Sequence, residues 1–159
     1  MDAIVAVYDD WGIGFAGTQP VALSADRKFF RATTKGAAVI VGRKTLADFP
    51  GGQPLPKRRN IVLSRQAQSI DGVEIAHSPA DAAKLVECEE KAFVIGGGSV
   101  YRQMLPMCQR VYVTKVHTTP ESDTYFHDLD KDPNWKLVQF LESGEENGIL
   151  YEMCLYQRV

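Results

Sequence analysis

Four short, nearly continuous apolar runs constrain the fold of this chain more than any other feature. They are rich in β-branched residues and occupy Ala3–Val7, Ala37–Val41, Asn60–Leu63 and Ala92–Ile95. A strand that is apolar without alternation is covered on both faces, which is typical of a parallel sheet with helices on either side. The runs therefore predict buried strands of an α/β sheet.

Segments with helical signals lie between these runs. Ser24–Thr34 begins with a capping-type serine, and Ala80–Val86 follows a serine and a proline suited to the first helical position. Ser99–Leu105 follows a run of glycines and is stopped by Pro106. We therefore expect helices that alternate with the buried strands.

The last part of the chain is different. Three strand-like runs, Val111–Val116, Trp135–Leu141 and Ile149–Tyr156, follow one another without a convincing helix between them. Residues 145–148, with the sequence EENG, form a good hairpin turn before the last run. The sequence thus predicts one α/β domain over residues 1–159, with a mainly parallel sheet and an antiparallel edge. The glycine-rich segment Tyr8–Leu23 is expected to be a long functional loop, of the kind that often serves as a mobile lid.

Composition excludes several classes of function. The formal net charge is −2, and the short basic stretch Lys57–Arg59 is too small for a nucleic-acid surface. Cys88, Cys108 and Cys154 are odd in number and widely spaced, which predicts neither a disulfide framework nor a metal site. The start of the chain has no basic region typical of a signal peptide, and no apolar run reaches membrane-spanning length. We expect a cytoplasmic protein that binds neither membrane nor nucleic acid.

Three segments could carry chemistry, and each has a plainer interpretation. Gly42–Thr45 follows a strand with two cations beside a possible helix start, which suits phosphate but also a solvated basic turn. Gly96–Ser99 frees backbone N–H groups for a pyrophosphate, or permits tight packing; it matches neither the G-x-G-x-x-G fingerprint nor a P-loop. Asp26 could hold an amino-substituted heterocycle beside Phe30, or simply complement the helix dipole.

Together, in this order, these segments resemble the dihydrofolate reductase family over nearly the whole chain. The residues that carry the resemblance are Ala6; Gly12-Ile13-Gly14; Pro20; Leu23–Asp26 with Phe30 and Thr34; Val41–Thr45; Pro54-Leu55-Pro56 with Arg58-Arg59-Asn60; Leu63-Ser64-Arg65; Val94–Gly98 with Tyr101; Tyr112-Val113-Thr114; and Asp123-Thr124 with Phe126. The resemblance implies a mixed, mostly parallel eight-stranded sheet with an antiparallel C-terminal hairpin and about four flanking helices. It also implies that pteridine and nicotinamide meet in a central cleft.

The implied activity is the NADPH-dependent reduction of 7,8-dihydrofolate to 5,6,7,8-tetrahydrofolate, which feeds one-carbon metabolism. A hydride goes to C6 and a proton to N5, and N5 protonation makes the imine a better hydride acceptor. By resemblance, Asp26 is the catalytic carboxylate: it binds the 2-amino group and N3 side of the pteridine and helps N5 acquire its proton through water and the pteridine. Thr114 would hydrogen-bond Asp26 and the amino group. The implied substrate-binding residues are Ala6, Asp26, Arg27, Phe30, Leu55, Arg58, Tyr101 and Thr114, with Arg58 pairing with the α-carboxylate of the glutamate tail.

The resemblance also implies a cofactor site and no metal. Ala6, Ile13, Ile95 and Tyr101 would surround the nicotinamide, while the basic residues would hold the 2′-phosphate and favour NADPH over NADH. The full implied set is Ala6, Ile13, Gly14, Gly42, Arg43, Lys44, Thr45, Leu63, Ser64, Arg65, Ile95, Gly96, Gly97, Gly98, Ser99, Val100 and Tyr101.

Three positions depart from the usual bacterial pattern. Val21 stands where a tryptophan is usual, Arg27 where an apolar residue is usual, and Gln19 where methionine is common. Two other interpretations remain open: a reductase of another pterin or of a ribosylamino-pyrimidine, and a non-catalytic protein that binds folate and NADPH. Because no apolar surface stripe stands out, we expect a monomer.

Overall fold

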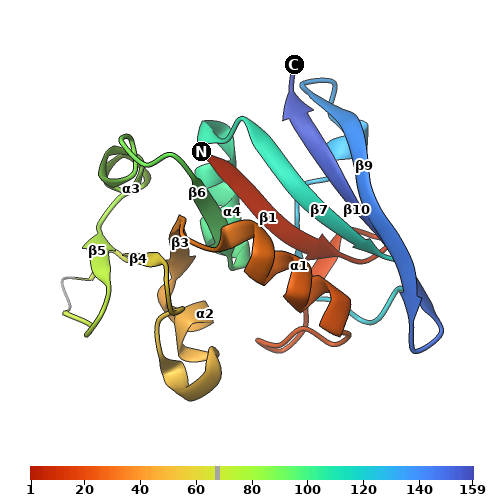
Figure 1. Cartoon of the computed structure of the whole chain (residues 1–159), viewed down its shortest axis with the longest axis horizontal. Helices are drawn as coiled ribbons and strands as arrows, with labels where there is room; N and C mark the ends of the chain where they lie inside the picture. Colours follow the sequence, from red (N-terminus) through yellow and green to blue (C-terminus); the bar gives the residue numbers. More distant parts are fainter. Residues whose placement is uncertain (67–68) are drawn as a thin grey trace. The chain divides into compact units, whose positions relative to one another are not determined.

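The computed structural model describes residues 1–66 and 69–159, which form an α/β fold around an eight-stranded sheet (Figure 1). The strand order is β5-β4-β3-β6-β1-β7-β10-β9. The strands are β1 Asp2–Val7, β3 Ala38–Gly42, β4 Arg59–Leu63, β5 Glu74–Ala76, β6 Ala92–Gly96, β7 Arg110–Val116, β9 Trp135–Glu146 and β10 Ile149–Arg158. The helices are α1 Ser24–Thr34, α2 Arg43–Ala47, α3 Pro79–Leu85 and α4 Gly98–Met104, with short 3₁₀ turns at Pro50–Gly52, Leu105–Met107 and Leu129–Lys131. The predicted sheet and helices are confirmed.

The chain divides into two compact units. The first comprises Met1–Ala3 and Ala32–Cys108, and the second comprises Ile4–Arg31 and Gln109–Val159. In the first unit β3 pairs in parallel with both β4 and β6, and β4 pairs in parallel with β5. Helix α4 lies beside β6 and β3, and α3 lies beside β5 and β4 (Figure 1).

Burial explains why the continuous apolar runs predicted strands of the first unit so well. Val39, Ile40 and Val41 of β3 are all fully buried, so side chains that point to opposite faces of the sheet are equally covered. Ile61 and Val62 of β4 behave in the same way. The boundaries of β3, β4, β6, α3 and α4 differ from their predicted positions by at most one residue, whereas β5 was not predicted.

The second unit contains the antiparallel part of the sheet. Strand β10 pairs with β7 on one side and with β9 on the other. The hairpin between β9 and β10 turns through Asn147 and Gly148, whose φ angles of 53° and 77° lie in the left-handed region that a two-residue turn of this kind requires. Strand β9 continues to Glu146, beyond the predicted end at Leu141.

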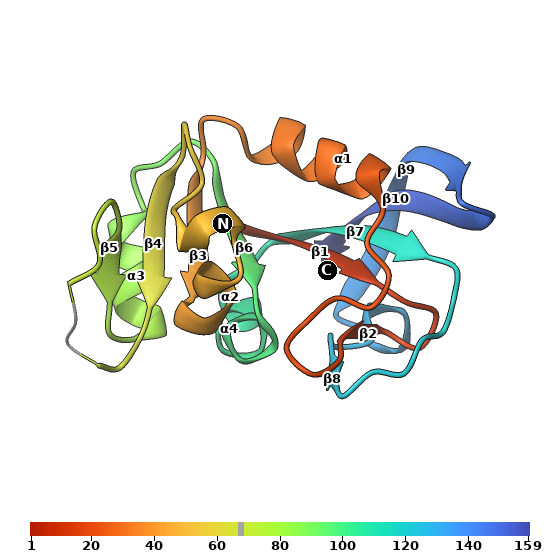
Figure 2. The same ribbon diagram turned by 90° about the horizontal axis from the view of Figure 1, so that it is seen from below.

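The sequence predicted a long loop over Tyr8–Leu23, but the segment is not a loop throughout. Residues Gly12–Gly14 form strand β2, which pairs with β8, Thr124–Tyr125, in a separate two-stranded sheet (Figure 2). Glycines at two of three positions conceal a strand from pattern analysis. Close packing demands at least one of them, since a Cβ atom at Gly12 would lie 2.7 Å from the Cβ of Ser122.

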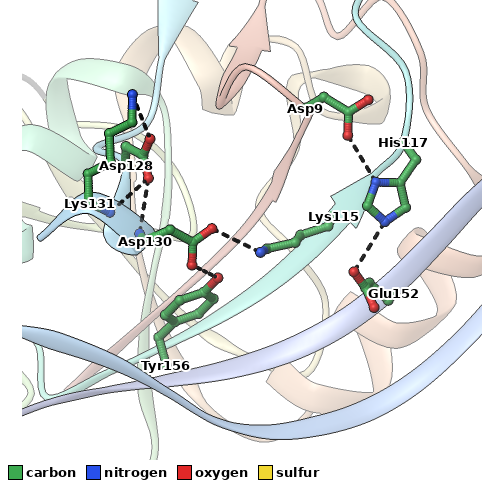
Figure 3. A network of polar contacts seen from close by, with 8 residues as sticks. All are labelled: Asp9, Lys115, His117, Asp128, Asp130, Lys131, Glu152 and Tyr156. Atoms are coloured by element: carbon green, nitrogen blue, oxygen red, sulfur yellow. Dashed lines mark hydrogen bonds and ion pairs between the residues drawn. The ribbon is translucent and has the colours of Figure 1, made fainter.

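Polar contacts fasten the start of this segment to β7 and β10 (Figure 3). The ring of His117 lies between two carboxylates, with Nδ1 2.9 Å from Asp9 Oδ1 and Nε2 3.2 Å from Glu152 Oε1. These two carboxylates raise the pKa of His117 above its usual value, chiefly through the bond with Asp9. Nearby, Lys115 pairs with Asp130 at 3.1 Å, and Asp130 also accepts a hydrogen bond of 2.6 Å from the Tyr156 hydroxyl.

The raised pKa of His117 predicts a pH-dependent contribution to stability. A group with a higher pKa in the folded state stabilises it fully below the unfolded pKa, about 6.5 for histidine, and this contribution is lost as pH rises through the folded pKa. His117 is partly exposed, so solvent screening limits the effect to below about 1 kcal/mol. We expect His117→Gln to lower the free energy of unfolding at pH 5.5 and to have a smaller effect at pH 8.5, measured by urea denaturation.

The matched control is His77→Gln, because the His77 ring contacts the Ser64 carbonyl oxygen and no carboxylate contact is seen for it in the part of the chain described. An equal loss of stability at both pH values for His117→Gln would contradict the prediction.

Candidate functional site

The first turn of α1 is held by a residue from the far end of the chain. One carboxylate oxygen of Glu146 accepts the Ser24 backbone N–H at 2.8 Å, and the other accepts the Ser24 hydroxyl at 2.7 Å and the Ala25 N–H at 3.0 Å. These bonds lower the pKa of Glu146, so it carries its charge at the positive end of the helix dipole. Glu146 thus caps the first turn and also complements the helix dipole, which is the role that the plainer interpretation gave to Asp26.

Asp26 itself lies in a different environment from a capping residue. It is half-buried in the first turn of α1 and is hydrogen-bonded to the hydroxyl of Thr114, a buried residue of β7. Burial raises the pKa of the Asp26 carboxyl, and the opposing effects of Thr114 and Arg27 do not cancel this shift. A partly desolvated carboxyl with a fixed hydroxyl partner is suited to a paired hydrogen bond with an amino-substituted ring and to holding a proton.

The other predicted residues of the second unit lie on three elements. Phe30 is half-buried one turn after Asp26 on α1, and Ala6 is half-buried on β1. Ile13 and Gly14 are half-buried on β2. Arg27 is exposed, and its charge acts on both Asp26 and Glu146, lowering the pKa of each. The charge of Arg27 is therefore near both carboxylates, at the solvent-exposed rim of the first turn of α1.

In the first unit, the two glycine segments lie together at the carboxyl ends of neighbouring strands. Val41 of β3 is opposite Gly96 of β6 in the parallel register. A Cβ atom at Gly97 would lie 2.9 Å from Thr45 Oγ1, and one at Gly42 would lie 3.0 Å from Val100 Cγ2. Tight packing, the plainer interpretation of the Gly96–Ser99 segment, therefore accounts for Gly96, which has a φ of 119° and lies against the ring of Tyr101. Gly42 is also closely packed, which neither interpretation of its segment had predicted.

Close packing against Thr45 also constrains Gly97, but close packing does not cover the whole glycine segment. Gly97 and Gly98 are only half-buried, and Ser99 is exposed. Their backbone groups therefore remain accessible beside Thr45 at the edge of the sheet where ligands of parallel sheets gather. The remaining predicted residues of α4 and β6, Val100, Tyr101 and Ile95, are buried.

A third predicted segment lies at the end of β4, the strand next to β3. Leu63 is buried, Ser64 is half-buried and Arg65 is exposed. Arg43, at the start of α2, reaches this segment by donating from Nη1 to Gln66 Oε1 at 2.7 Å, while Lys44 stays exposed. His77 completes the group, with its Nδ1 3.1 Å from the Ser64 carbonyl oxygen. Nothing in the sequence pattern marked His77.

The segment that contains Leu55 and Arg58 is held by two buried polar side chains. The amide of Asn60 accepts the Leu55 N–H at 3.0 Å and donates to the carbonyls of Leu55 and Arg58 at 2.9 and 3.0 Å. The Arg58 guanidinium donates from Nε to Thr34 Oγ1 at 2.8 Å and from Nη1 to the Pro56 carbonyl at 2.7 Å. The two buried residues, Thr34 and Asn60, are among those that carry the resemblance, but neither was given a role. An asparagine inside an apolar strand was the available signal.

Neither a metal cluster nor a membrane-crossing helix is found among residues 1–66 and 69–159. No group of three or more His, Cys, Asp or Glu side chains there could hold a metal ion. No helix there is long and apolar enough to cross a membrane.

Comparison with known proteins assigns this arrangement to a family. The family model described as "Dihydrofolate reductase" matches residues 1–158. The chain is 40% identical to a dihydrofolate reductase of Staphylococcus haemolyticus, over 98% of this chain and 94% of the relative, and 36% identical to that of Bacillus subtilis (strain 168), over 92% and 87%. A solved structure of dihydrofolate reductase from Enterococcus faecalis, complexed with NADP(H) and RAB-propyl, matches with a TM-score of 0.87 and 31% identity, over 99% of this chain and 95% of that one. With the fold and these segments in place, the chain belongs to the dihydrofolate reductase family.

Proposed function

We infer that the protein reduces 7,8-dihydrofolate to 5,6,7,8-tetrahydrofolate with NADPH and so supplies one-carbon metabolism. The observation that carries this function is the Asp26 carboxyl, which has a raised pKa, is hydrogen-bonded to buried Thr114 and is free of the capping role that Glu146 performs. The family model matches residues 1–158, which supports residues 1–159 working as one reductase domain.

Asp26 performs two tasks in this reaction. Its two oxygens accept hydrogen bonds from the 2-amino group and the N3 side of the pteridine, which sets the orientation of the ring. Its negative charge favours a proton on the ring system, and N5 acquires that proton through water and the pteridine. The Thr114 hydroxyl keeps the carboxyl in place and contacts the same amino group. Protonation at N5 makes C6 a better hydride acceptor.

The cofactor residues of the first unit fit an extended dinucleotide. The half-buried backbone at Gly97 and Gly98, with Thr45 beside it, is suited to the pyrophosphate. Arg43, Lys44, Ser64 and Arg65 hold the adenosine end and its 2′-phosphate, with His77 as an additional member of that group. Ala6, Ile13, Ile95 and Tyr101 contact the nicotinamide. NADPH, when bound, supplies the hydride.

The remaining residues bind the tail of the substrate. Phe30 and Leu55 contact its aromatic middle, and Arg58, aimed by Thr34 and Pro56, pairs with the α-carboxylate. Arg27 at the rim remains hydrated beside Glu146 and reaches the carboxylates of the tail. We also propose a monomer in the cytoplasm. The location is supported by Cys88, Cys108 and Cys154, which form no disulfide with one another.

The preference for NADPH over NADH tests whether the basic residues Arg43, Lys44 and Arg65 bind the 2′-phosphate. The unsubstituted protein should oxidise NADPH with dihydrofolate and prefer NADPH to NADH, because a 2′-phosphate pairs with cations near Ser64. Arg43→Ala should lower that preference about tenfold, which is the effect of losing about 1.4 kcal/mol. The measurement is kcat/KM with each cofactor. Lys91→Ala is the control, because Lys91 is exposed just before β6, at the strand end opposite Gly96; an equal effect of both substitutions would contradict the assignment.

Substitution of Asp26 tests the carboxyl. Asp26→Asn keeps the shape and removes the charge, and we expect turnover at pH 7 to fall by about 10²–10⁴-fold, the usual contribution of such a group. Part of the activity should return at lower pH, where the substrate is already protonated in solution. A pH profile of kcat/KM unchanged from that of the unsubstituted protein would show that Asp26 has no part in proton supply.

Asn60 tests the tail-binding segment. Asn60→Ala removes the amide that holds the backbone of Leu55 and Arg58, and it leaves buried polar groups without partners at a cost of about 1–3 kcal/mol. We expect a lower free energy of unfolding, a higher KM for dihydrofolate and an unchanged KM for NADPH. The control is Asn134→Ala, since Asn134 is exposed. A parallel rise in both KM values would indicate general damage instead.

A further inference from the structure

Tyr8 joins the two ends of the segment Tyr8–Leu23. It follows β1 directly, and its side chain is 2% exposed. Its hydroxyl donates to the Val21 carbonyl oxygen at 2.8 Å and accepts the Val21 backbone N–H at 2.8 Å. One side-chain atom thus satisfies both backbone polar groups of a single residue, as a neighbouring strand would do.

Both partners of this contact are fixed from other directions. The backbone of Tyr8 donates to the Gly12 carbonyl and accepts from the Trp11 N–H, each at 2.9 Å, which sets the start of the segment. Tyr8 forms a buried cluster with Leu23 and Val116, and Val21 packs against that cluster. The Tyr8 ring therefore cannot follow Val21 if the chain there moves away, and the two hydrogen bonds would break.

The position of Val21 gives this contact a consequence for the site. Val21 is three residues before α1, and α1 carries Asp26 in its first turn. The Tyr8 phenol is also close enough to Asp26 for the carboxylate charge to raise its pKa, together with a larger effect of burial. The cluster containing Tyr8 includes Val116, which lies two residues beyond Thr114 on β7.

We propose, on the basis of the function inferred above, that Tyr8 is a positioning residue of the reductase reaction, whose hydroxyl holds the Val21 backbone so that the chain enters α1 with Asp26 correctly placed. The residue acts through Val21 and does not touch the substrate. Its effect is therefore on the geometry of the chemical step, and only weakly on the affinity for either ligand.

The test compares Tyr8→Phe with Tyr151→Phe. Each substitution removes one hydroxyl, from Tyr8 of the cluster or from Tyr151, which packs against the cluster. The Tyr151 hydroxyl lies beside Gly144 instead of the Tyr8–Leu23 segment. For Tyr8→Phe we expect kcat to fall about tenfold, as expected for the loss of about 1.4 kcal/mol in the transition state, with KM for dihydrofolate changed less than kcat. The deuterium isotope effect on kcat, measured with NADPH deuterated at the transferred position, should rise. Tyr151→Phe should change none of these. Equal kcat values for the two variants would overturn the proposal.

Hydrogen exchange tests the contact without reference to the substrate. In the unsubstituted protein the Val21 amide should exchange more slowly than that of exposed Gln19, and Tyr8→Phe should accelerate Val21 selectively, with β7 amides unchanged. A Val21 amide that exchanges as fast as Gln19 in the unsubstituted protein overturns the proposal even if Tyr8→Phe folds poorly. Acceleration of all amides together would show a merely structural role and would also overturn it. Failure of the unsubstituted protein to turn over dihydrofolate, with Val21 still protected, would instead refute the proposed function.

Discussion

The second unit depends on the bond between the Glu146 carboxylate and the first turn of α1. The free N–H groups of a helix N-terminus need acceptors, and here the acceptor comes from the end of β9, 122 residues further along the chain from Ser24. With that need met, Asp26 is available to hydrogen-bond Thr114 and to lose part of its solvation. The two carboxylates at this helix start thus have different partners, since Glu146 holds the backbone of the first turn and Asp26 contacts β7.

Much of the fold was predictable because its signals are local. The apolar runs identified the buried parallel strands, and the boundaries of α1 match the predicted Ser24–Thr34, which a capping-type serine begins. Strands β2 and β8 were not predictable, since their pairing joins residues more than a hundred positions apart and neither has an alternating pattern. The two strands are stabilised by each other, and no local propensity reveals them.

The candidate site likewise has a part that local motifs predicted and a part that depends on long-range contacts. Asp26, Thr114 and the glycine segments could be named from ordered motifs, although the motifs could not decide between ligand binding and packing. At Gly42, Gly96 and Gly97 the structure shows that neighbouring side chains need the space, although Gly97, like Gly98, is only half-buried. Glu146, Asn60 and Tyr8, whose side chains hold backbone near the candidate site, were not recognised in that role, because each makes a backbone contact that no sequence pattern encodes.

The register of β9 fixes how far this part of the chain can change in length. A bulge at Leu141 interrupts the pairing with β10, because Glu142 is opposite Met153 while Phe140 is opposite Cys154. From Glu142 onward the side chains alternate between the two faces up to Glu146. Insertion or deletion of a single residue there would turn the Glu146 carboxylate to the opposite face, away from α1. Between Glu142 and Glu146 the hairpin can therefore accept substitutions of residues other than Glu146, but not length changes of a single residue.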